Sequence, residues 1–307
     1  MTNIIKMNDY IKFIDSNSIK LGKIAFEMKD YNLSLINYKK AVKKLRQYKG
    51  KNTYPLHLIG LLENKINAIQ EEEKNKSTTK QKLDYQNWNL SKSSFVKGKQ
   101  CVKYLYLDKH KKKERTPPSE KTLALFEKGH QFEDFFREQN FENGINVKEN
   151  LGFNFGYFPS YTDFLLEKNT QITLFEATFI ESDILIMCDV VDKIGENLYD
   201  FYEIKSHTHM QEVIWNDLAI QYFICKQRFG EKAINTFNVV LRDENNEGKI
   251  IDAKDELEGR IGNINSLIKK FKTILENDEP KIEMGEHCLS PYKCDFMEYC
   301  EKLKVDL

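Results

Sequence analysis

Three apolar segments follow one another between residues 173 and 206, separated by only a few polar residues. Runs of this length that are rich in Ile, Val, Phe and Tyr are typical of β-strands, and we expect strands at 173–181, 184–194 and 198–206. The short break IGEN between the second and third runs predicts a hairpin. A sheet at the centre of the fold is therefore the strongest constraint that this sequence imposes.

Helical patterns flank the expected sheet. Residues 119–140 and 211–229 are predicted to be helices, 237–241 a further strand, and 253–277 one long helix. The order α, β, β, β, α, β indicates the α/β class, with helices packed on the sheet.

The N-terminal region has a different pattern. Apolar residues at spacings of three and four predict three helices within residues 1–75, which would form an all-α three-helix bundle. A polar stretch at 76–89 reads as a linker, and 90–307 as a second domain. The bundle resembles the microtubule-interacting and trafficking (MIT) hairpin bundle and a single tetratricopeptide-like unit. This resemblance implies an adaptor for a protein partner, and a plain packing subdomain is the alternative.

Two expected strands carry charged residues that suit metal chemistry. Glu203 and Lys205 lie two residues apart and so share one face of a strand, with the Ile204 carbonyl between them. Asp189 lies in the apolar run ILIMCDVV, where an unpaired charge is costly to bury. Carboxylate and carbonyl oxygens suit Mg²⁺ or Mn²⁺, and a lysine beside them indicates phosphodiester hydrolysis. Glu-x-Lys alone is a weak motif, and the location of Asp189 strengthens it.

The segments FEATF, IMCDVV, EIKSHT and DLAIQYFICKQRFG together resemble the RecB-like branch of the PD-(D/E)XK nucleases. The resemblance implies a restriction-endonuclease-like core with a mixed central sheet flanked by helices. It also implies that His130, after Gly129, joins Asp189, Glu203 and the Ile204 carbonyl at the metal.

By the same resemblance, Gln221 is expected to position Lys205 or the substrate strand. Many members of this branch have Tyr four residues after the Gln, whereas this chain has Cys225 there, and Tyr222 is only a candidate for the Tyr role. Glu176 is either a carboxylate supporting the site or an ordinary strand-edge charge. We expect His207 and His209 to be loop residues.

Cysteines cluster near the C-terminus. Cys288, Cys294 and Cys300 recur at steps of six residues, and Cys101 is a plausible fourth ligand. The N-terminal sequence lacks the features of a secretory signal, so we expect a cytoplasmic protein, in which clustered cysteines indicate a metal or cluster site instead of disulfides. Four thiolates suit Zn²⁺ or an iron-sulfur cluster equally well by ligand type.

The cysteine layout resembles the RecB-like nucleases that hold a four-iron (4Fe-4S) cluster, including the exonucleases of CRISPR adaptation and the helicase-nucleases of recombination. The elements Ser-Lys-Ser before Cys101 and Pro-Tyr-x-Cys at Cys294 also resemble a related bacterial family of unassigned function. The resemblance favours iron-sulfur over zinc. Cys188 and Cys225, which have apolar neighbours, are expected in the core.

Charge is balanced over the whole chain, with 47 Lys and Arg against 47 Asp and Glu, so a polyanion site must be local. The run from Asp108 to Arg115 is basic and is either a solvated loop or a phosphate-gripping patch. We expect a Mg²⁺- or Mn²⁺-dependent deoxyribonuclease acting on single-stranded DNA or duplex ends, in DNA repair, CRISPR adaptation or phage defence. The alternative is an inactive DNA-end-binding or protein-docking module. No membrane segment is predicted.

Overall fold

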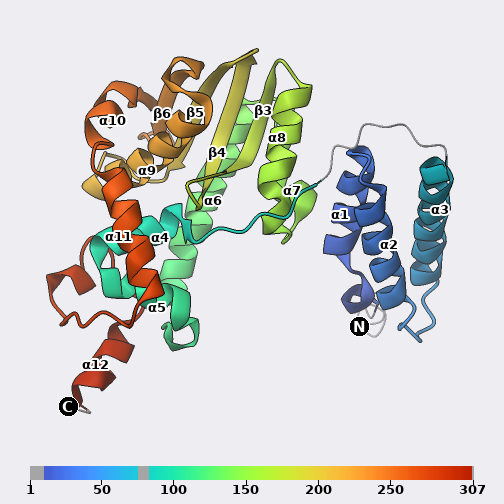
Figure 1. Ribbon diagram of the computed structural model, residues 1–307, viewed down its shortest axis with the longest axis horizontal. Coiled ribbons are helices and arrows are strands. Elements are labelled where there is room, and N and C mark those ends of the chain that lie inside the picture. The colour runs from blue at the N-terminus through green and yellow to red at the C-terminus, as the bar shows by residue number, and fades with distance from the viewer. Residues whose placement is uncertain (1–9, 75–82, 306–307) are drawn as a thin grey trace. The chain divides into compact units, whose positions relative to one another are not determined.

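The computed structural model describes residues 10–74 and 83–305 (Figure 1). The chain divides into two compact units, Met1–Gln86 with Asn146–Lys168 and Asn87–Ile145 with Asn169–Leu307. Half of the predicted linker, residues 76–82, lies outside the described residues. The segment Asn146–Lys168 belongs to the first unit by its contacts, although it lies inside the range predicted for the second domain.

The first unit contains the three predicted N-terminal helices, α1 (Ser16–Glu27), α2 (Tyr31–Leu45) and α3 (Tyr54–Lys74). Asp15 and Asp30 cap the first two, because each carboxylate accepts a backbone N–H of the first turn at 3.1 Å. Their apolar faces form one buried cluster, so the predicted helical bundle is confirmed in the described residues.

Two further helices complete this unit, α7 (Val147–Leu151) and α8 (Phe158–Lys168). Asn154, between them, donates from Nδ2 to the carbonyl of Asn17 at 3.1 Å, and α7 contacts α1. Neither helix was predicted, since the apolar residues of this stretch are interrupted by glycines and polar residues.

The second unit is built on a mixed seven-stranded sheet of order β2-β3-β4-β5-β6-β7, with β1 paired to β4. The strands are β1 (Leu90–Ser91), β2 (Ile145–Asn146), β3 (Ile172–Glu181), β4 (Ile184–Gly195), β5 (Leu198–Lys205), β6 (Ile234–Leu241) and β7 (Lys249–Asp252). Strands β3, β4 and β5 form two antiparallel pairs, β5 and β6 run parallel, and β6 pairs antiparallel with β7. The predicted α/β class and the hairpin through IGEN are confirmed.

Helices make up much of the second unit besides the sheet (Figure 1). They are α4 (Lys92–Gln100), α5 (Val102–His110), α6 (Glu120–Asn140), α9 (Glu212–Phe229), α10 (Lys254–Arg260), α11 (Ile264–Glu276) and α12 (Met297–Val305). The prediction of one helix over 253–277 is wrong. The chain turns at Gly262 and Asn263, two residues that favour turns over helix interiors, and so forms α10 and α11 instead. Within residues 10–74 and 83–305, none of the helices is long and apolar enough to cross a bilayer.

Helices α6 and α9 pack on opposite faces of the sheet. Phe201 and Tyr202 are adjacent in β5 and therefore point to opposite faces. Phe201 packs on Phe229 of α9 with ring centroids 5.8 Å apart, whereas Tyr202 packs on Phe141, directly after α6, at 5.1 Å. The strands β4 and β5 therefore lie between α6 and α9.

Helix α4 fits closely against α11 because residue 98 is glycine. A Cβ atom on Gly98 would lie 2.8 and 2.9 Å from two ring carbons of Phe271, whose ring is buried and packs edge-on against Phe95. The close approach fixes the position of the whole of α4, which runs from Lys92 to the residue before Cys101.

Gly98→Ala should therefore lower the free energy of unfolding by about 1–3 kcal/mol, because the added methyl group forces the Phe271 ring out of its packed position. Gly259→Ala in α10 is the matched control, since no atom lies within 4 Å of its Cβ position. It should be neutral or stabilise by up to about 1 kcal/mol, because alanine is the better helix former. Urea unfolding of the full chain measures both variants, and equal stabilities would contradict the close-contact explanation.

Candidate active site

Strands β4 and β5 separate beside Asp189 and Glu203. Their pairing proceeds to Val190 opposite Tyr202 and does not continue to Asp189. The backbone N–H of Ile204, released from that ladder, instead donates to Asp189 Oδ2 at 2.7 Å. A side chain thus replaces a strand-to-strand bond, and the Asp189 carboxylate is drawn toward β5.

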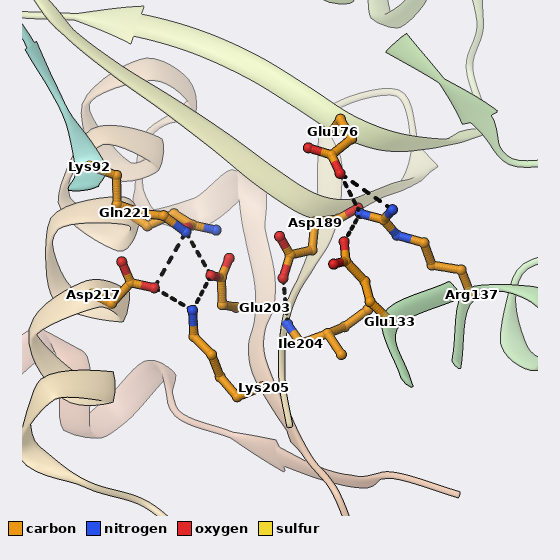
Figure 2. A network of polar contacts seen from close by, with 10 residues as sticks. All are labelled: Lys92, Glu133, Arg137, Glu176, Asp189, Glu203, Ile204, Lys205, Asp217 and Gln221. Carbon is orange, nitrogen blue, oxygen red and sulfur yellow. Dashed lines mark hydrogen bonds and ion pairs between the residues drawn. The ribbon is translucent and has the colours of Figure 1, made fainter. Parts of the chain in front are cut away.

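Glu203 and Lys205 meet on β5 as predicted from their spacing. Lys205 Nζ lies 2.6 Å from Glu203 Oε1 and 2.6 Å from Oδ2 of Asp217, a residue of α9 (Figure 2). Burial disfavours the ammonium form of Lys205, but Asp217 and Glu203 outweigh burial and raise its pKa well above the ordinary value. Burial also opposes ionisation of Asp217, yet Lys205 and Lys92 hold the pKa of that carboxyl well below its usual range.

A second lysine reaches the same carboxylates from α4. Lys92 Nζ lies 2.6 Å from Glu203 Oε1, 2.8 Å from Gln221 Oε1 and 3.4 Å from Asp217 Oδ2. Burial acts against its positive charge, but Asp217 and Glu203 raise its pKa above the ordinary value. The structure therefore places Gln221 against Lys92, where Lys205 was the expected partner.

Arg137 of α6 contacts two carboxylates and one backbone carbonyl on the other side of Asp189. Its guanidinium lies 2.5 Å from Glu133 Oε1 and 3.3 Å from Glu176 Oε1, and it donates to the Asp189 carbonyl at 2.7 Å. Glu176 has a φ of 55°, which is rare for a residue with a side chain and marks local strain. Between the two roles left open for Glu176, these contacts favour a carboxylate that supports the site.

His130 is not buried with these groups. Its side chain is 68% exposed, and its Nδ1 lies 3.8 Å from Glu133 Oε2. Glu133, one turn further along α6, is the residue whose carboxyl lies beside Asp189 (Figure 2). Burial and the negative charge of Asp189 raise the pKa of Glu133 to about 8.

Sequence reasoning missed four residues of this network: Lys92, Glu133, Arg137 and Asp217. Two signals were present in the sequence. Glu133 and Arg137 are an i,i+4 pair that alternates with the buried Phe132 and Phe136, and Asp217 precedes Gln221 by four residues on one helix face. Lys92 gave no signal beyond its Ser-Lys-Ser context, because its partners are more than one hundred residues away.

Carboxylates outnumber cationic side chains in this network (Figure 2). Burial raises the pKa of Glu203, and the charge of Asp189 raises it further. Glu203 is 2% exposed, and its Oε2 atom accepts no hydrogen bond from the described residues. Among the described residues, no group of three or more His, Cys, Asp or Glu side chains has the spacing of metal ligands. The crowded oxygens fit a divalent cation, which would neutralise Glu133, Asp189 and Glu203 together.

The four predicted cysteine ligands come together at a second centre. Cys101, Cys288, Cys294 and Cys300 line one cavity of about 20 Å³, between α5 and the start of α12. The backbone N–H of Cys294 donates to the Cys288 carbonyl at 2.8 Å, which closes the loop between those two cysteines. Segments from the two ends of this unit therefore meet at these thiols.

The surroundings of the four thiols suit a soft metal centre. Tyr104, Phe296 and Met297 line the same cavity. Burial, together with the three neighbouring cysteines, raises the pKa of Cys294 to about 11, because nearby thiolates repel one another. A bound cation or cluster reverses that repulsion, since coordination favours the thiolate. The thiol set fits both Zn²⁺ and an iron-sulfur cluster.

The remaining predicted residues fall into ordinary structural positions. Cys188 and Cys225 are fully buried in the core, as expected, and His207 and His209 lie in the loop after β5. Within the basic run, Arg115 pairs with Asp108, and the three lysines that precede Glu114 are exposed.

Arg137→Met should lower the free energy of unfolding by about 3–5 kcal/mol, because it leaves the buried Glu133 and Glu176 carboxylates without their counter-charge. Arg228→Met is the matched control: Arg228 Nη1 lies 3.2 Å from Glu181 Oε1, and both side chains are partly exposed. This control should lose no more than about 1 kcal/mol. Chemical unfolding distinguishes the two, and similar small losses would show that Arg137 does not hold the network.

The sequence matches no family model and no curated protein.

Proposed function

We propose that this chain is a metal-dependent nuclease that hydrolyses phosphodiester bonds of DNA. One observation carries the proposal: Asp189, Glu203 and Lys205 meet where β4 and β5 separate, with Glu203 Oε1 2.6 Å from the Lys205 ammonium. Phosphoryl transfer requires oxygen ligands that hold a metal ion and a positive charge that stabilises the phosphate, and these residues provide both. The RecB-like PD-(D/E)XK assignment, including its restriction-endonuclease-like core, belongs to the same proposal.

Each residue of the site has a distinct role in the proposed reaction. Asp189, Glu203 and the Ile204 carbonyl would hold Mg²⁺ or Mn²⁺, and Glu133 takes the place expected for His130. When bound, the cation lowers the pKa of a water molecule and polarises the phosphate. Lys205, held by Asp217, stabilises negative charge on the phosphate under attack. Arg137 fixes the Asp189 backbone through its carbonyl.

DNA, as single strands or duplex ends, is the proposed substrate. The exposed lysines of the basic run lie in the same unit and would contact backbone phosphates. The N-terminal helices would bind a protein partner. DNA repair, CRISPR adaptation and phage defence are the settings that fit such an enzyme.

Lys205→Ala should reduce Mn²⁺-dependent cleavage of labelled single-stranded and duplex-end DNA by about 100-fold or more, because the charge facing the phosphate is lost. Lys226→Ala is the matched control, since Lys226 lies on α9 but pairs with Glu258 outside the network. It should cleave at the wild-type rate. A Lys205→Ala protein of wild-type activity would overturn the site assignment, and a wild-type protein that binds DNA yet stays inert with Mn²⁺ would support a docking module instead.

We also propose that the four cysteines hold a 4Fe-4S cluster. Cys294→Ala should abolish the visible absorbance and the bound iron of anaerobically purified protein, because one of four ligands is removed. Cys225→Ala, at a buried cysteine outside the cavity, should keep both. If the wild-type protein contains zinc and no iron, the site is a Zn²⁺ site and not a cluster. If the Cys294→Ala protein keeps its full iron content, this set of ligands is wrong.

A further inference from the structure

Lys92 is the residue of α4 whose side chain contacts the carboxylates of the candidate active site. It is the first residue of that helix, directly after the capping residue Ser91, whose hydroxyl accepts the Ser94 N–H at 3.2 Å. The Lys92 side chain is 17% exposed, although an ammonium group favours water. Its burial therefore depends on the carboxylates and the amide that it contacts.

Two ammonium groups share one carboxylate oxygen. Lys92 Nζ and Lys205 Nζ each lie 2.6 Å from Glu203 Oε1. One lysine is enough to neutralise one buried carboxylate, and a second like charge at the same atom adds repulsion. Asp217 Oδ2, 2.6 Å from Lys205 and 3.4 Å from Lys92, supplies a second negative charge, so the two lysines and the two carboxylates balance until a cation competes for Glu203.

The two lysines are not held equally. Lys205 lies 2.6 Å from Asp217 Oδ2, whereas Lys92 lies 3.4 Å from the same atom. The remaining partner of Lys92 is Gln221, a neutral amide, and hydrogen bonds between a charged and a neutral group are weaker than those between two charged groups. If Glu203 turns to a cation, Lys92 loses its principal partner while Lys205 keeps one.

An unpartnered donor lies beside Lys92. Gln221 is fully buried, and its Nε2 atom has no acceptor among the described residues, because its Oε1 atom faces Lys92. A buried amide N–H without a partner is costly and indicates an acceptor supplied by a ligand. A phosphate oxygen is such an acceptor, and it would also attract the ammonium.

We propose that Lys92 is a second lysine of the catalytic centre, which leaves Glu203 when a divalent cation binds and then contacts a non-bridging oxygen of the substrate phosphate together with Gln221. This inference rests on the proposed nuclease function for its last step. Its first step, the competition between Lys92 and a cation for Glu203, is independent of any activity.

The test compares Lys92→Met with wild type and with Lys99→Met, a control on the same helix whose lysine contacts Asn216 outside the network. Binding of Mn²⁺ alone is measured by calorimetry, and single-turnover cleavage of DNA is measured over a range of Mn²⁺ concentrations. Lys92→Met should bind Mn²⁺ several-fold more tightly, because a competing cation is gone, and should cleave about 100-fold more slowly at saturating Mn²⁺. Lys99→Met should match wild type in both.

A purely structural lysine gives a different result. Lys92→Met would then lose thermal stability, with Mn²⁺ binding and cleavage per folded molecule within twofold of wild type, and the proposal would be overturned. Lys92→Arg, which keeps the charge, should restore part of the cleavage rate and is used also where the methionine variant does not fold. Inert wild-type protein would reject the nuclease function, while unchanged Mn²⁺ binding in Lys92→Met would reject the role of Lys92.

Discussion

The buried carboxylate of Glu203 is the group on which the rest of the second unit depends. A charge that is 2% exposed is tolerated only with counter-charges at contact distance, and these come from separate elements: Lys205 on β5 itself and Lys92 on α4. Asp217 on α9 in turn holds Lys205. The strand, the two helices and the register between them are therefore fixed by one electrostatic requirement, in addition to apolar packing.

Helix α4 links the two candidate centres. Its first residue, Lys92, lies in the carboxylate network, and Cys101 follows its last residue and lies in the thiol cavity. Nine helical residues span about 13 Å, a short and stiff connection. Gly98 allows this helix to lie directly on Phe271 of α11. Ligation of Cys101 together with the C-terminal cysteines would close a long loop of chain and hold one end of α4, so the proposed metal centre at the thiols would stabilise the position of Lys92.

Periodicity predicted the parts of the fold that depend on local sequence. The strands β3, β4 and β5 and the helices α6 and α9 were expected within two residues of their observed ends, because alternating and helical apolar patterns are local. Short elements such as β1 and the helices of 146–168 were missed, since they are stabilised by distant contacts. The position of Lys92 against Glu203 and Gln221 is likewise a long-range property. On α6, the sequence predicted His130 at the site, whereas His130 is exposed and Glu133, one turn away, is the residue whose carboxyl lies beside Asp189.

The charge balance of the network explains why it accommodates both lysines and why the proposed cation would fit there as well. Burial and the negative charge of Asp189 raise the pKa values of Glu133 and Glu203. Lys92 and Lys205 relieve this on one side and Arg137 on the other. A divalent cation carries two positive charges to the same oxygens, and it has no long side chain that must be ordered. A bound cation would therefore displace the ammonium that is held least, and that ammonium would need a new anion, which a substrate phosphate would supply under the proposed function.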